Sequence, residues 1–320
     1  MSRLLSTVSA ITFIAGTYAS ADIPKVVADI APIHSLVSRV MDGVGEPKLI
    51  VPNETSPHDY RLRPADAEAI ENANLVFWMG EGLTPWMERA LEALSNDTDI
   101  IEFLALEEST LLSFREGALF EAHDHSDHDD HDKDHDDHDD HDDHAGHDHG
   151  EYDPHAWLST NNAKTWLNVI AARLSSIDPD NAGAYFANAS EARGEMDALD
   201  VEINTMLDPV RGGKFVVFHD AYQYFETVYD FPASGAISLG DASDPSAARV
   251  AEIANRIKSE NIACVLSEPQ FNAGLVKTVM GGTDATTEVI DPLGFGIEPG
   301  KSLYPKLIRA MAQSLVNCLK

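Results

Sequence analysis

The chain has 320 residues, of which 43% are hydrophobic, and a formal net charge of −32. So strong a negative charge argues against nucleic acids and anionic membrane surfaces as partners, because both attract basic proteins. It is compatible with a cationic ligand. Without a leader the chain still has about 300 residues, enough to bury two hydrophobic cores, and we therefore expect two domains.

Residues 1–21 have the features of a signal peptide. Arg3 precedes an apolar stretch, and Ala19, Ser20 and Ala21 form a small-residue cleavage site. The apolar stretch is shorter than the roughly 20 residues that a membrane-spanning helix needs, which disfavours the alternative of a membrane anchor. We therefore expect export, with a mature chain that begins at Asp22.

The next hundred residues alternate between short apolar runs and longer helical patterns. This alternation predicts βα units and a parallel sheet. The expected strands are 25–30, 48–51, 75–78 and 99–102, and the expected helices are 33–41, 64–72 and 85–94.

The second half repeats the alternation after a helix at 161–176 and a long, mostly polar helical pattern at 179–207. The expected strands are 214–218, 235–239, 263–267 and 288–290, and the expected helices are 221–229, 247–260, 272–280 and 303–318. We predict an α/β protein with two lobes, each containing a parallel-type sheet flanked by helices, joined by one long helix. The predicted boundaries are 22–176 for the N-terminal lobe, 177–210 for the connecting helix and 211–320 for the C-terminal lobe.

Residues 123–149, the His/Asp tract, interrupt this pattern. The tract contains thirteen aspartates, one lysine and ten of the fourteen histidines of the chain. The ten are His123, His125, His128, His131, His135, His138, His141, His144, His147 and His149. No packed core tolerates this density of charge, so the tract is predicted to be a solvated loop. A generic acidic solubility tract would not need histidine, and imidazole with carboxylate favours metal capture, with zinc the leading ion.

Four histidines remain outside the tract. His58 follows one expected strand, His219 ends another, and His155 precedes a helix. Ligands of open α/β sheets bind beyond the carboxyl ends of strands, and Asp291 has the same placement. These three histidines and one carboxylate could supply the four or so ligands that zinc requires. His34 is a possible supporting residue, but a surface histidine is the simpler interpretation.

Two cysteines, Cys264 and Cys318, lie in the last fifth of the chain. In an oxidising compartment this pair can form a disulfide that fastens the C-terminal helix to the strand at 263–267. Two buried free thiols are the alternative.

Several short motifs, in this order, resemble those of the periplasmic zinc-binding proteins of ABC importers. The motifs are 56–60 (SPHDY), 153–158 (DPHAWL), 217–222 (VFHDAY), 267–271 (SEPQF) and 291–294 (DPLG). The resemblance covers essentially the whole mature chain, including the position of the tract and the two cysteines. It implies a periplasmic, monomeric binding subunit that holds Zn²⁺ between two lobes and delivers it to an inner-membrane ABC permease.

The resemblance also implies a ligand set of His58, His155 and His219. Related manganese-type proteins have a carboxylate where this chain has His219, which favours zinc. Some zinc-binding members have Glu where this chain has Pro57, so the fourth ligand is open between Asp291 and a solvent molecule. The alternatives are a passive zinc buffer that relies on the tract, or a zinc hydrolase, which would need an open metal position and a base such as Asp220 or Glu268. We expect a binding protein and not an enzyme.

Overall fold

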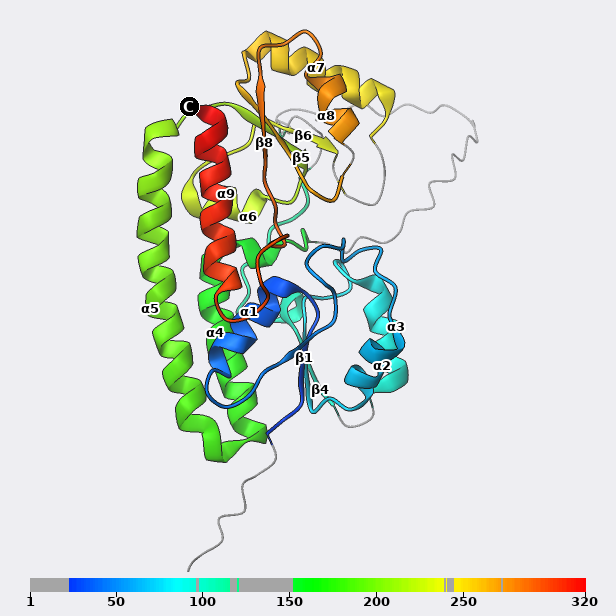
Figure 1. Ribbon diagram of the computed structural model, residues 1–320, viewed down its shortest axis with the longest axis vertical. Helices are drawn as coiled ribbons and strands as arrows, with labels where there is room; N and C mark the ends of the chain where they lie inside the picture. The colour runs from blue at the N-terminus through cyan, green and yellow to red at the C-terminus, as the bar shows by residue number, and fades with distance from the viewer. Residues whose placement is uncertain are drawn as a thin grey trace, which may run out of the picture.

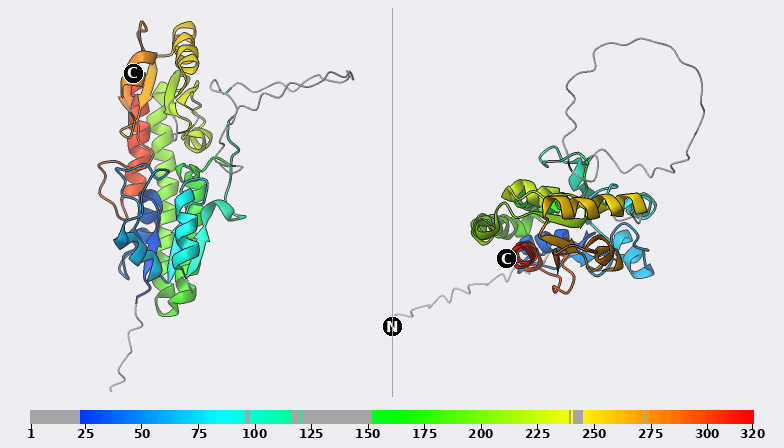
Figure 2. Two further views of the ribbon diagram at one scale, coloured as in Figure 1. Left: turned by 90° about the vertical axis from the view of Figure 1, so that its right-hand side faces the viewer. Right: turned by 90° about the horizontal axis from the view of Figure 1, so that it is seen from above.

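A computed structural model describes residues 23–95, 98–115, 120, 152–238, 240, 245–271 and 273–320. The predicted signal peptide and the His/Asp tract lie outside the described residues. Two lobes lie one above the other along a long helix (Figures 1 and 2).

The first lobe is built on a parallel sheet with strand order β2-β1-β3-β4. Its strands are β1 (Val26–Ala28), β2 (Lys48–Leu49), β3 (Leu75–Trp78) and β4 (Asp99–Glu102). Its helices are α1 (Ala31–Val40), α2 (Pro64–Glu71), α3 (Pro85–Leu94) and α4 (Thr160–Ile177), with short 3₁₀ turns η1 (Phe103–Ala105) and η2 (Ala156–Leu158). Helices α1 and α4 cover one side of the sheet, and α2 and α3 lie on the other (Figure 1).

The second lobe repeats this plan with strand order β6-β5-β7-β8, again parallel. Its strands are β5 (Phe215–His219), β6 (Ala236–Ser238), β7 (Cys264–Ser267) and β8 (Thr286–Val289). Its helices are α6 (Gln223–Tyr229), α7 (Ala247–Glu260), α8 (Ala273–Val279) and α9 (Leu303–Leu319).

Strand β5 is buried on both faces, which explains its uninterrupted apolar sequence. Val216 and Phe218 belong to a separate cluster with Ile253 and Ile257 of α7. Phe215 and Val217 point to the other face and join the main core.

Helix α5 (Ala182–Leu207) follows the 3₁₀ turn η3 (Pro179–Asn181), ends at η4 (Asp208–Val210), and connects the lobes. Its buried residues lie three or four positions apart and so form one stripe on an otherwise polar helix. They are Tyr185, Ala189, Ala192, Met196, Leu199, Ile203 and Leu207. This stripe packs against α4 and α9, which explains how so polar a sequence forms a helix of 26 residues.

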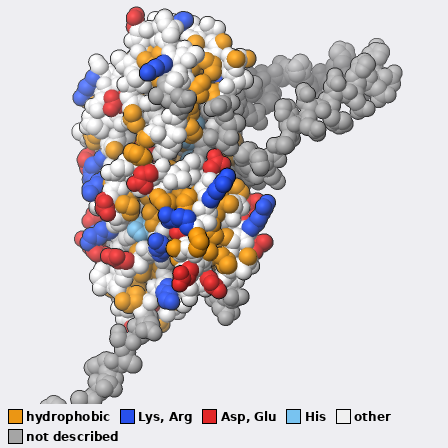
Figure 3. All heavy atoms as spheres, turned by 45° about the vertical axis from the view of Figure 1, so that its right-hand side comes forward, with side chains coloured by type: hydrophobic (Ala, Val, Ile, Leu, Met, Phe, Trp, Pro, Cys, Tyr) orange, Lys and Arg blue, Asp and Glu red, His pale blue; other side chains and the backbone are white. Residues whose placement is uncertain are grey.

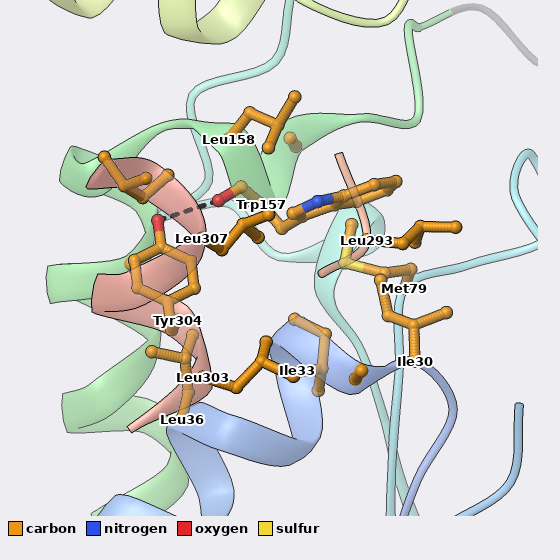
Figure 4. Packing of buried hydrophobic residues seen from close by; sticks show 14 of the residues in the cluster. Ile30, Ile33, Leu36, Met79, Trp157, Leu158, Leu293, Leu303, Tyr304 and Leu307 are labelled. Atoms are coloured by element: carbon orange, nitrogen blue, oxygen red, sulfur yellow. Dashed lines mark hydrogen bonds between the residues drawn. The ribbon is translucent and has the colours of Figure 1, made fainter. Parts of the chain in front are cut away.

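Helix α9 contacts both halves of the molecule. Near its start, Tyr304 donates its backbone N–H to Ser35 Oγ of α1 at 2.9 Å and its hydroxyl to the Trp157 carbonyl at 2.8 Å. Leu303 and Leu307 pack in the same region (Figure 4). At its other end, Cys318 is disulfide-bonded to Cys264 of β7. The predicted fold class and disulfide are therefore confirmed.

On the face shown in Figure 3, hydrophobic side chains gather in the middle of the molecule, with charged side chains of both signs around them. This face is therefore not uniformly acidic, despite the net charge of the chain. Among the described residues, no helix is long and apolar enough to cross a membrane.

Candidate metal centre

Three histidines from separate segments line one cavity between the lobes. His58 lies in the loop after β2, His155 immediately precedes η2, and His219 is the last residue of β5. The cavity volume is about 20 Å³. Since one water needs roughly 10–15 Å³ measured in this way, the cavity has room for one or two water-sized species.

The remaining wall is mostly apolar, with three polar side chains: Ser56 from the loop that carries His58, and Glu268 and Gln270 from the segment after β7. The apolar residues are Pro57, Leu83, Trp157, Phe271, Pro292 and Leu293. Such a wall is of low polarity, so interactions between charges at the cavity are screened less than in bulk water.

His155 is held by the carboxylate two residues before it. Asp153 Oδ1 lies 2.7 Å from His155 Nδ1 and also accepts the His155 backbone N–H at 3.0 Å. Both residues are buried. A carboxylate only accepts hydrogen bonds, so Nδ1 carries the ring proton and Nε2 presents its lone pair.

His219 has the same arrangement with a partner that is distant in sequence. Glu268 Oε1 lies 2.6 Å from His219 Nδ1, and both side chains are buried. The Glu268 carboxylate therefore leaves the Nε2 lone pair of His219 directed into the cavity.

These two lone pairs converge, since His155 Nε2 and His219 Nε2 are 3.4 Å apart. When both Nε2 atoms present lone pairs, they cannot hydrogen-bond to each other. Two ligands of one tetrahedral zinc ion, with Zn–N bonds of about 2.0–2.1 Å, have their nitrogens roughly 3.3–3.4 Å apart. His155 and His219, which we call the carboxylate-held pair, are therefore arranged to bind one cation.

His58 stands farther from this pair and is only partly buried. Its ring centroid is 6.3 Å from that of His155, whereas the rings of His155 and His219 are 5.3 Å apart. Its segment is held through the backbone, because Trp86 of α3 donates its indole N–H to the Pro57 carbonyl at 2.7 Å.

Within the described residues, no group of three or more His, Cys, Asp or Glu side chains is already arranged to hold a metal ion. The three histidines nevertheless share one cavity. The ring separations reconcile the two observations: a shift of His58 by about 1 Å toward His155 would give it the spacing of the carboxylate-held pair.

Asp291 lies just beyond β8, as the sequence indicates, but it does not line the cavity. Its carboxylate accepts hydrogen bonds from Gln270 Nε2 and the Leu293 backbone N–H, each at 3.1 Å, and from the Phe295 backbone N–H. Asp291 therefore fixes the turn that follows it. Its role as a direct ligand stays a prediction.

His34 is not a surface residue, and that interpretation was wrong. It is buried in α1, where Nε2 lies 3.0 Å from the Pro47 carbonyl and Nδ1 lies 3.5 Å from Ser38 Oγ. Burial lowers its pKa. The helical periodicity at 33–41 places it on the inner face, and it does not line the cavity.

Beside the cavity, Arg115 joins the segment that leads into the tract to the second lobe. Its guanidinium donates two hydrogen bonds to Asp220, the residue after His219, one of them at 3.0 Å. It donates two more to Glu226 of α6, at 2.7 and 3.1 Å. Burial raises the pKa of Asp220 and of Glu226, while Arg115 opposes the shift. For Arg115, these hydrogen bonds outweigh the effect of burial and raise its pKa. The three side chains form a buried ion cluster next to a candidate ligand.

The predictions from sequence gave no role to Asp153, Trp86 or Gln270. They included Glu268 only as the base of the alternative zinc hydrolase. The spacing in Asp153-Pro154-His155 was a usable signal, because a residue two positions away can reach a histidine ring through a turn. Trp86 and Gln270 meet the site only through tertiary contacts.

Comparison with known proteins places the chain in one family. Residues 26–318 match the family described as "Zinc-uptake complex component A periplasmic", ZnuA. The chain therefore belongs to the ZnuA family. It is a transport protein that binds zinc in a periplasmic uptake system, and not an enzyme.

Individual relatives agree over nearly the full length. The high-affinity zinc uptake system protein ZnuA of Brucella abortus (strain 2308) is 46% identical, with 100% of this chain and 99% of the relative covered. The protein of the same description from Paracoccus denitrificans (strain Pd 1222) is 43% identical, with 94% and 93% covered.

Solved structures confirm the fold. A crystal structure of ZnuA has a TM-score of 0.73 at 23% identity and covers 93% of this chain and 100% of its own. FpvC from Pseudomonas aeruginosa in complex with Mn²⁺ has a TM-score of 0.73 at 19% identity, with 93% and 99% covered.

Proposed function

We propose that this protein captures Zn²⁺ in the periplasm at His58, His155 and His219 and delivers it to the inner-membrane permease of an ABC importer. The carboxylate-held pair carries the proposal, because its two buried Nε2 atoms lie 3.4 Å apart at a small cavity. Nitrogen ligands favour zinc over manganese, which prefers oxygen. The predicted signal peptide and the periplasmic family support the location.

The ligand set is tested by titrating the mature protein with zinc. Calorimetry and competition with a chromophoric chelator both measure the zinc affinity. His58→Ala, His155→Ala and His219→Ala should each weaken binding by orders of magnitude. His34→Gln is the matched control, since this histidine is buried but outside the cavity, and should leave zinc affinity unchanged once folding is verified. The ligand assignment fails if two of the three alanine variants keep wild-type affinity.

We further propose that the His/Asp tract binds additional zinc ions more weakly than the cavity does. A segment that must gather its ligands loses conformational entropy on binding, whereas a preformed cavity avoids most of this cost. At the same time, the tract raises the local concentration of zinc near the lobes. The protein acts as a monomer in this proposal, because one chain supplies all three histidines of the cavity.

Deletion of residues 123–149 separates this function from that of a passive buffer. The deletion variant should keep one tight site, lose several weak ones, and show a zinc-uptake defect in cells mainly at limiting zinc. A passive buffer would instead lose most of its binding. Unchanged growth under zinc starvation would favour a solubility tract.

A further inference from the structure

The fourth position around the metal can be assigned from Gln270. We propose that a solvent molecule occupies this position, that the Gln270 side-chain oxygen accepts a hydrogen bond from it, and that Asp291 orients the Gln270 amide. This proposal rests on the proposed zinc site and specifies how that site is completed.

The orientation of the Gln270 amide follows from its partner. Gln270 lines the cavity, and its Nε2 donates to Asp291 Oδ1 at 3.1 Å. A carboxylate offers only acceptors, so the NH₂ group must face Asp291 and the amide oxygen must point elsewhere. Asp291 therefore fixes which end of the amide is presented.

The amide oxygen presented in this way has unused hydrogen-bonding capacity. Gln270 Oε1 is buried, and no donor among the described residues reaches it. Buried acceptors are nearly always paired in proteins, so an unpaired one beside a candidate metal site indicates a ligand that carries a proton. A zinc-bound water has such a proton, and zinc itself prefers nitrogen, thiolate and carboxylate ligands to the amide oxygens that suit harder cations.

Asp291 is poorly placed to bind the metal itself. It does not line the cavity, and its two oxygens already accept the side chain of Gln270 and the backbone N–H groups of Leu293 and Phe295. Direct coordination would disrupt the turn at 291–295 and release the Gln270 amide. A cavity of about 20 Å³ can instead hold the ion together with one small ligand.

The test uses the full mature protein loaded with Co²⁺, whose visible absorption reports the ligands in a site built for zinc. Azide should displace the bound solvent in the wild type and change the spectrum. Azide cannot donate a proton to Gln270 Oε1, so this oxygen favours water over azide. Gln270→Met should therefore bind azide about tenfold more tightly and zinc about tenfold more weakly.

Two further variants complete the design. Gln223→Met is the matched control, because Gln223 Oε1 is also buried without a donor among the described residues but lies outside the cavity; its azide and zinc affinities should equal those of the wild type. Asp291→Asn should keep the azide response and lose no more than about tenfold in zinc affinity. Gln270→Leu replaces Gln270→Met if the latter does not fold.

An azide-insensitive wild type that becomes sensitive in Asp291→Asn would show that Asp291 is a direct ligand and overturn the proposal. Unchanged azide affinity in Gln270→Met would also overturn it, because Gln270 would then not contact the solvent. Failure of the zinc site itself gives a different result, in which His155→Ala binds Co²⁺ and zinc as the wild type does.

Discussion

The two sides of the cavity differ in how their histidines are held. His155 and His219 are buried, and each ring is fixed by a carboxylate at 2.7 or 2.6 Å. His58 is partly exposed, and one contact that holds its segment is the Trp86 hydrogen bond to the Pro57 backbone. The carboxylate-held pair is thus positioned before metal arrives, whereas the His58 ring lies farther from His155, with centroids 6.3 Å apart against 5.3 Å within the pair.

The difference also reflects what lies behind each ligand. Tyr224 of the second lobe donates its hydroxyl to the Asp153 carbonyl at 2.8 Å and accepts the Leu112 backbone N–H at 3.0 Å. The residue that orients His155 is therefore tied to the lobe that carries His219. On the other side, Asn53 Nδ2 donates to the carbonyls of Ile297, at 2.9 Å, and of Gly294. That contact fixes the start of the His58 loop, five residues before the ligand.

The largest expected effect distinguishes the two sides directly. His155→Ala and His219→Ala should each weaken zinc binding by more than roughly 100-fold, which is the upper end of the loss expected when only a residue that hydrogen-bonds to a metal ligand is removed. His58→Ala should weaken it less than either, because the carboxylate-held pair still binds. Competition with a chelator of known affinity measures all three. Equal losses would mean that the preorganisation of the pair carries no energetic weight.

Removal of Arg115, whose ion cluster lies next to His219, should lower the free energy of unfolding. Arg115→Met leaves Asp220 and Glu226 buried without their cation, and breaking a buried ion cluster in this way costs roughly 3–5 kcal/mol of unfolding free energy. Urea unfolding of the metal-free protein at neutral pH measures the loss. Arg173→Met, which removes an exposed arginine 3.8 Å from Asp99, is the control and should change the free energy of unfolding little.

The same variant has a defined pH dependence. The pKa values of Asp220 and Glu226 are already raised in the folded protein, and loss of Arg115 should raise them further. A raised carboxyl pKa favours folding at low pH, and this contribution is lost as pH rises through the folded-state pKa. Arg115→Met should therefore be less destabilising near about pH 5 than near about pH 8. A pH-independent loss would contradict the role of charge.

Loss of a carboxylate partner should weaken zinc binding without removing a ligand. In Glu268→Gln the side chain keeps its size but can present an amide N–H to His219, so the ring is no longer held with Nε2 free. We expect zinc affinity to fall about 10- to 100-fold. Glu252→Gln on α7, whose partner is Arg249, is the matched control and should bind zinc normally. If the zinc affinity of Glu268→Gln equals that of the wild type, packing alone orients His219 and the role of the carboxylate is wrong.

The smallest effect concerns the His58 side. Trp86→Phe keeps an aromatic ring beside Tyr60 but removes the hydrogen bond to Pro57. One such bond is worth about 0.5–1.5 kcal/mol, so zinc affinity should fall by roughly threefold to tenfold. Stopped-flow measurement of zinc release should show the change mainly in the dissociation rate. Trp166→Phe removes the corresponding bond to Ser109 in the first-lobe core and should leave zinc release unchanged.

The sequence alone was sufficient for local structure. Strands β3 and β4 and helices α3 and α7 have the predicted ends, because apolar periodicity and capping depend on neighbouring residues. Only two cysteines were available to pair, and the disulfide between them is present. The placement of His58 and His219 after or at strand ends also follows from sequence, since parallel strands direct their carboxyl ends to one edge of a sheet.

What tertiary structure decided is which side chains become partners in the site. Glu268 meets His219 although 49 residues separate them, and Gln270 meets Asp291 across 21. Helix α9 begins against the first lobe and ends at the second, which its own pattern does not reveal. Periodicity specifies which face of an element is buried, but the strand order β5-β7-β8 decides that Glu268 meets His219 and that Gln270 meets Asp291. The packing of the two lobes along α5 decides that His155 of the first lobe meets His219 of the second.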